Sequence, residues 1–180
     1  MKAIFEVLRA AAVFWIANRD DVLDLCAAAK ELFRRGESSR TPPDAAEARK
    51  EIVRLCLWRP TAFDVMPDDV VQRIINGFGP DAWPQWLRDA LDWVFRNFTP
   101  LAVIHDVQFY LSDGTRKGFD ETLRFWRLNS AILLDDRYPI RNVRQWPARA
   151  VAWLKLKASL KALELGSWMV WKSAAMRRTR

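Results

Sequence analysis

Apolar residues recur along the chain at intervals of three and four, the spacing that places them on one face of an α-helix. In the first third of the sequence this pattern predicts helices over residues 2–18, 21–35 and 44–58. A segment rich in Gly, Ser and Pro, residues 36–43, separates the second helix from the third. We therefore expect an N-terminal helical unit over residues 1–60.

The same periodicity continues beyond Pro60. It predicts helices within residues 61–75, 83–94, 99–110 and 119–134, and from Pro147 to the end of the chain. A turn with two glycines, Asn76–Pro80, and a polar loop, Asp113–Gly118, interrupt it. We expect a central unit over residues 61–136 and a basic amphipathic helix within residues 137–180. That helix either packs on the core or extends from it.

Composition agrees with an all-α fold, either one domain of ordinary size or one domain with a helical appendage. The chain has 180 residues, of which 51% are hydrophobic, and this is enough to build a core. It contains only six glycines, which argues against a β-rich fold full of tight turns.

The net charge of +7 is spread unevenly along the chain. Residues 137–180 hold eleven Lys and Arg and a single acid, Glu164, whereas residues 1–136 are close to neutral. A basic tail of this kind favours an anionic partner, such as phospholipid headgroups, nucleic acid or an acidic protein face. A solvated basic helix without such a partner is the alternative.

Two tryptophans close the basic helix and suggest two ways in which it is used. It can lie in a membrane interface, or it can dock with its apolar face over the core. In either case the candidate contacts with a membrane or partner are Trp168, Trp171, Lys155, Lys157 and Lys161.

Cysteines and the N-terminus exclude several classes of protein. Cys26 and Cys56 lie in apolar-periodic surroundings and are interpreted as buried free thiols. One histidine and two distant cysteines cannot build a zinc site. The apolar run Ala10–Ala17 is too short to span a bilayer, and no signal-peptide cleavage site follows it. We expect a location in the bacterial cytosol or in a particle assembled there.

The stretch Leu101–Tyr110, which reads LAVIHDVQFY, is the best candidate for chemistry. It contains His105, the only histidine of the chain, followed directly by Asp106. A neutral imidazole can act as a general base near neutral pH. A hydrogen-bonded core histidine is the structural alternative.

Three segments give this stretch a context. They are Asn76-Gly77-Phe78-Gly79, His105-Asp106-Val107-Gln108-Phe109 and Thr122-Leu123-Arg124-Phe125-Trp126. In order and internal spacing they resemble the phospholipase A₂ superfamily, in particular its short bacterial and bacteriophage members, over Ile75–Leu134. The resemblance implies a two-helix core and Ca²⁺-dependent hydrolysis of phospholipid esters at a membrane. It assigns His105 as the general base, and Asp106 with the backbone carbonyls of Gly77 and Gly79 as Ca²⁺ ligands.

Several positions depart from that pattern. Leu123 stands where the family has the aspartate that orients the histidine, and Phe109 stands where it has tyrosine. Phe78 and Ala102 replace the two cysteines of the family's disulfide. Asp120, one turn from Leu123, and Glu121, two residues before Leu123, are the candidates to replace the missing aspartate in catalysis.

Three functional hypotheses therefore stay open. The first is a Ca²⁺-dependent lipid ester hydrolase, and the second is an inactive phospholipase-like structural or interaction protein of a phage particle. The third is a helical protein that binds an anionic membrane or, less favoured, nucleic acid through its basic tail.

Overall fold

The computed structural model describes residues 43–78 and 85–178, and every regular element within them is helical. The elements are α3 (Ala45–Arg54), α4 (Thr61–Val65), α5 (Asp68–Ile74), α6 (Gln85–Val94), η1 (Arg96–Phe98), α7 (Thr99–Tyr110), α8 (Arg116–Arg137), η2 (Val143–Gln145), α9 (Trp146–Gly166) and α10 (Trp168–Arg178). The predicted all-α class is confirmed for these residues. The helices predicted over 2–18 and 21–35, with Cys26, lie outside the described residues, as does Gly79.

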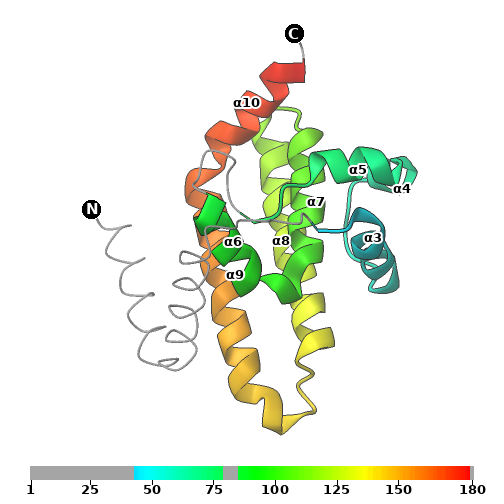
Figure 1. Ribbon diagram of the computed structural model, residues 1–180. Coiled ribbons are helices and arrows are strands. Elements are labelled where there is room, and N and C mark those ends of the chain that lie inside the picture. Colours follow the sequence, from blue (N-terminus) through cyan, green and yellow to red (C-terminus); the bar gives the residue numbers. More distant parts are fainter. Residues whose placement is uncertain (1–42, 79–84, 179–180) are drawn as a thin grey trace.

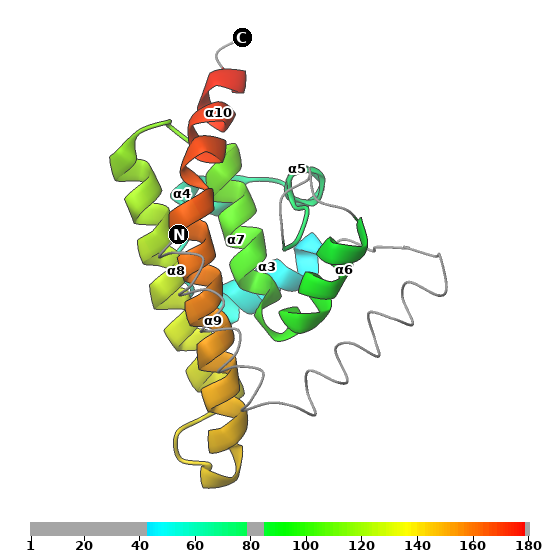
Figure 2. The same ribbon diagram turned by 90° about the vertical axis from the view of Figure 1, so that its left-hand side faces the viewer.

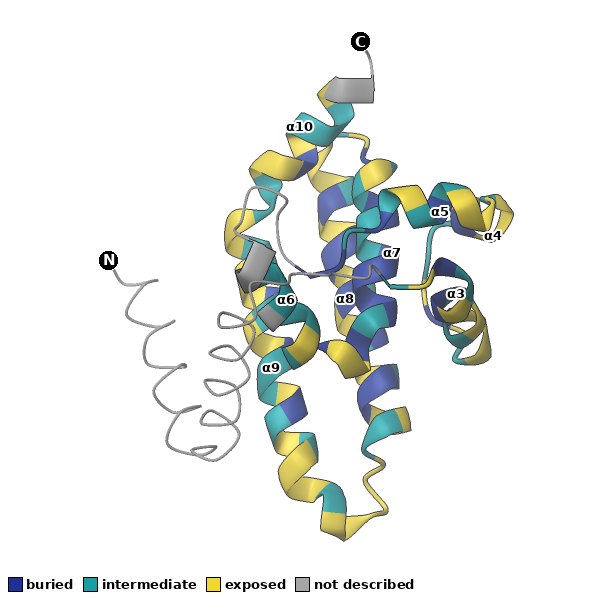
Figure 3. Cartoon of the chain, in the orientation of Figure 1, coloured by how far each residue is buried: buried dark blue, intermediate teal, exposed yellow. Residues whose placement is uncertain are grey.

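Helix α7 forms the centre of the fold, and α3, α5, α8 and α10 all pack against it (Figure 1). Its residues from Pro100 to Ile104 are buried, as are Val107 and Gln108, so that apolar side chains cover most of its circumference (Figure 3). Pro100 lies in the first turn, where a missing N–H leaves no hydrogen bond unmade. The predicted boundaries of this helix are confirmed.

Helices α8 and α9 run side by side as a long hairpin (Figures 1 and 2). Helix α8 begins three residues earlier than the sequence pattern predicts, because the Thr115 hydroxyl accepts a hydrogen bond from Gly118 N at 3.0 Å and caps the helix. The periodicity of α9 predicts that Ala152, Leu156, Leu160 and Leu163 share one face, and of these the first three are buried and Leu163 is half-buried.

The C-terminal helix is not continuous. It ends at Gly166, and α10 begins at Trp168 and packs against α7 and α9. Trp171 anchors α10, since its side chain is only 4% exposed and its indole N–H donates to Thr115 O at 3.1 Å. Ser112 Oγ in turn donates to Trp171 O at 2.8 Å. Trp171 therefore docks α10 onto the α7–α8 turn.

Asn129 joins the segment after α3 to α8. Its side-chain oxygen accepts from Trp58 N and its amide donates to Trp58 O, each at 2.7 Å. Asn129 is 1% exposed, so both bonds form away from water, where an unpaired partner is costly. Through this pair, residues 43–60 become part of the same core as α7.

None of the described helices is long and apolar enough to cross a membrane.

Cys56 follows α3 in a conformation that side chains rarely adopt. Its φ is 50°, and it occupies the position after the cap where helices usually place glycine. Leu57 N bonds to Ile52 O and Cys56 N to Val53 O, both at 3.0 Å, which is the Schellman pattern. The thiol is free and exposed, so the expectation that Cys56 is buried was wrong. The apolar periodicity extends past the true end of the helix.

We predict that Cys56→Gly stabilises the fold by about 1 kcal/mol, because glycine adopts this φ without a Cβ clash. Urea unfolding of the full chain measures the change. Cys56→Ala is the matched control, since it removes the thiol but keeps the Cβ. Equal unfolding midpoints for the two variants would contradict the assignment of strain to Cys56.

Candidate functional site

His105 and Asp106 lie next to each other on α7, half-buried between α8 and the segment before α6. His105 Nδ1 is 3.7 Å from Asp106 Oδ1, which is too long for a hydrogen bond. The opposite ring nitrogen, Nε2, is buried and has no hydrogen-bond partner. The imidazole instead contacts aromatic rings, with centroid distances of 4.3 Å to Phe109 and 5.5 Å to Trp126.

The partner helix presents an apolar surface at this place. Leu123 and Trp126 of α8 are buried, and the indole nitrogen of Trp126 also lacks a hydrogen-bond partner. Asp120 is exposed and pairs with Arg116 on its own helix at 3.0 Å. Within the described residues, Asp106 is the only carboxylate found within 4 Å of His105. The structure therefore does not bring Asp120 to the histidine as its orienting partner.

Asp106 holds the loop that precedes α6. Its Oδ2 accepts hydrogen bonds from Asn76 N at 2.9 Å and from Gly77 N at 3.2 Å. Gly77 has a φ of 77°, a conformation open to glycine, and this redirects the chain between Gly77 and Phe78. The next amide, Phe78 N, donates to Asp92 Oδ1 of α6 at 2.6 Å. Two carboxylates thus bind three successive N–H groups.

The orientation of the loop's peptide groups is the opposite of what a cation requires. Ca²⁺ takes six to eight oxygen ligands, and a loop that serves it must turn carbonyl oxygens toward the ion. Here the loop turns N–H groups toward Asp106, and the carbonyl of Asn76 accepts from Arg88 at 3.4 Å. No cluster of three or more metal-binding side chains occurs among the described residues. The described residues do not fit a calcium site, and no catalytic step is assigned to one.

The residues expected at a membrane or partner surface occupy different environments. Trp171 lies in the core, so its ring has no surface to offer a partner, and the role expected for it is corrected. Trp168 is half-buried against Phe119, with ring centroids 5.5 Å apart. Lys155 is half-buried, whereas Lys157 and Lys161 are exposed on α9. The burial of Trp171 and its hydrogen bond to Thr115 O dock α10 onto the core.

A different surface, which the sequence analysis did not single out, carries exposed apolar residues. We call it the hairpin tip and define it as residues 139–146, between α8 and α9. Ile140, Val143 and Trp146 are 61%, 64% and 54% exposed. Arg141 and Arg144 alternate with them and are exposed, with no carboxylate partner among the described residues. The alternation of apolar residues with arginine in this turn was the available signal.

The hairpin tip is an ordered turn. Asn142 N donates to Pro139 O at 3.0 Å, and Arg144 N donates to Asn142 Oδ1 at 3.2 Å. The Trp146 indole N–H donates to Ile140 O at 2.8 Å. In Figure 1 the tip projects past the other labelled helices at the lower end of the hairpin. The exposed apolar side chains thus lie in a hydrogen-bonded turn at the end of the hairpin.

Comparison with known proteins supplies no relative: no protein-family model, curated protein or solved structure matches this chain.

We predict that Asp106→Ala destabilises the fold by about 1–3 kcal/mol, because it leaves the Asn76 and Gly77 amides without an acceptor. Asp106→Asn keeps an acceptor oxygen, so we expect it to destabilise the fold less than Asp106→Ala does. Urea unfolding in calcium-free buffer measures both variants. A wild-type unfolding midpoint for Asp106→Ala would show that the carboxylate has no structural role.

Proposed function

We propose that this protein binds anionic phospholipid surfaces through the hairpin tip and does not hydrolyse them. The observation that carries the proposal is the tip itself, where Ile140, Val143 and Trp146 are more than half exposed beside Arg141 and Arg144. Soluble surfaces rarely gather large apolar side chains on one projecting turn without a binding partner.

The side chains of the tip suit both layers of a membrane interface, the apolar acyl layer and the charged headgroup layer. Apolar side chains gain about 25 cal/mol for each Å² of surface that they remove from water, and tryptophan favours the headgroup level. Each arginine near an anionic surface adds about 1 kcal/mol. The tip combines both kinds of residue within a single turn, so insertion and charge attraction act at the same place.

The surroundings of the tip extend its positive field. Residues 137–163 contain no Asp or Glu, and α9 continues the basic run with Lys157. Because the tip is already fixed by hydrogen bonds, binding costs little ordering entropy. These properties favour a membrane over nucleic acid, because a phosphate backbone offers no apolar layer into which Ile140 and Val143 can insert.

The His105–Asp106 pair supports a structural role within the same proposal. The imidazole lies among aromatic rings without a second carboxylate in the described residues, and Asp106 binds loop amides. A general base needs a partner that orients it and stabilises its protonated form. Fatty-acid release from anionic vesicles in Ca²⁺ equal to that of His105→Ala is therefore the expected result.

Vesicle sedimentation of the full chain tests membrane binding. We predict that the protein sediments with vesicles rich in phosphatidylglycerol and that Ile140→Ser with Val143→Ser weakens binding about tenfold, because two apolar side chains no longer insert. Arg141→Gln with Arg144→Gln should weaken it and reduce its dependence on salt.

Val65→Ser is the matched control. Val65 is 82% exposed on α4, so the substitution removes an even more exposed apolar side chain away from the tip. It should bind vesicles as the wild type does. Equal weakening by the control and the tip variant would contradict the proposal, as would equal binding to neutral phosphatidylcholine vesicles.

A further inference from the structure

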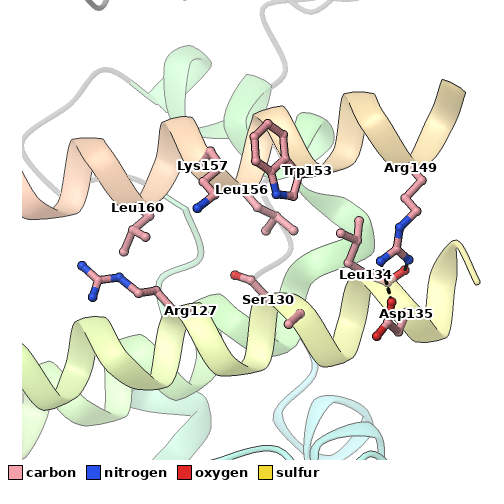
Figure 4. A pocket seen from close by; sticks show the side chains of 10 residues that line it. Arg127, Ser130, Leu134, Asp135, Arg149, Trp153, Leu156, Lys157 and Leu160 are labelled. Carbon is pink, nitrogen blue, oxygen red and sulfur yellow. Dashed lines mark hydrogen bonds and ion pairs between the residues drawn. The ribbon is translucent and has the colours of Figure 1, made fainter. Parts of the chain in front are cut away.

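A groove between α8 and α9 has an apolar floor. It encloses about 300 Å³, at the lower end of the range for small-molecule sites in proteins. Figure 4 shows its lining residues in the space between the two helices. The apolar lining consists of Ala131, Leu134, Trp153, Leu156 and Leu160.

One hydroxyl in this groove has no partner. Ser130 lies on the α8 side, and its Oγ is buried without a hydrogen bond. Figure 4 shows the Ser130 hydroxyl directed toward α9. Buried hydroxyls are nearly always paired, whereas the Ser130 hydroxyl remains available to donate to an acceptor in the groove.

Cations line one part of the groove. Lys157 is exposed, with its ammonium 5.5 Å from the Trp153 ring centroid, and it has no carboxylate partner among the described residues. Arg127 lies across from it on α8 and binds Glu164 at 2.5 Å. Lys157 therefore retains an uncompensated positive charge at the edge of an apolar surface.

The other end of the groove is closed. Arg149 of α9 binds Asp135 of α8 at 2.6 Å, and it also donates to Leu134 O and Tyr138 O. Figure 4 shows this ion pair spanning the two helices. A groove that is apolar, closed at one end and cationic further along is complementary to a short chain with one anionic head.

We propose that the groove binds a single-chain fatty carboxylate. Its hydrocarbon chain lies over Leu134 and Leu156 toward the closed end, and its carboxylate lies near Lys157, where it accepts a hydrogen bond from Ser130. This proposal does not rest on the membrane attachment of the hairpin tip, because the groove residues lie outside the tip.

Isothermal titration calorimetry with dodecanoate tests the proposal, using the full chain without vesicles and below the micelle concentration. We expect saturable micromolar binding by the wild type, and none for butyrate, which lacks the chain, or dodecanol, which lacks the charge. Lys157→Glu should weaken binding about tenfold through charge reversal. Ser130→Leu, which fills the groove and removes its hydroxyl, should abolish binding.

Lys172→Glu is the matched control. Lys172 is exposed and also lies over a tryptophan ring, at 5.8 Å from Trp168, but it belongs to α10. It should bind dodecanoate as the wild type does, and so should the Ile140→Ser, Val143→Ser tip variant. Failure of the tip to bind vesicles thus remains distinguishable from failure of the groove.

Two results would overturn the proposal. One is equal weakening by Lys157→Glu and Lys172→Glu, which would make the attraction a property of net charge alone. The other is a wild-type dimer in sedimentation equilibrium that Ser130→Leu dissociates, which would assign the groove to a second copy of this chain.

Discussion

Burial of α7 is the constraint on which the rest of the structure depends. A helix covered on most sides by α3, α5, α8 and α10 leaves little access to water for any polar group on it. Asp106 meets this constraint by accepting two backbone N–H groups, which supply the partners that a buried carboxylate needs. The loop before α6 is thereby fixed to α7, and α6 is held in turn through Asp92. Asp106 and Asp92 together therefore join α7, the loop and α6.

Much of the fold could be predicted because apolar periodicity and capping residues report helices directly. The boundaries of α7 and the buried stripe of α9 were read correctly. The start of α8 was missed because the Thr115 cap lies inside a segment whose glycines and charges are typical of a loop. The break at Gly166–Ser167 was missed because the apolar spacing continues through it. Trp171 is buried by α7 and α8, and local spacing does not distinguish a docked tryptophan from an interfacial one.

The arrangement of the candidate site could be predicted only in part, for a physical reason. Sequence placed His105, Asp106 and Gly77 in one region, and the structure brings Asp106 and Gly77 into contact. Whether a glycine loop turns its carbonyls or its amides toward a carboxylate depends on backbone dihedrals, which residue types leave open. The hairpin tip escaped notice because it lies in a turn, where exposure of Ile140 and Val143 depends on how α8 and α9 pair. The sequence motif with His105 and Asp106 lies on the central helix α7, whereas the exposed apolar surface lies at the end of the hairpin.

Membrane binding through the hairpin tip requires that the tip enter the membrane while the body of the protein stays in water. Spin labelling tests it most directly, with a nitroxide at position 143 or position 65 in a chain whose two native cysteines are replaced. In the presence of anionic vesicles, the account predicts that the label at 143 becomes accessible to oxygen and shielded from a water-soluble relaxation agent. The label at 65 should stay accessible to that agent. A vesicle-bound protein whose label at 143 remains as water-accessible as in free solution would contradict the account.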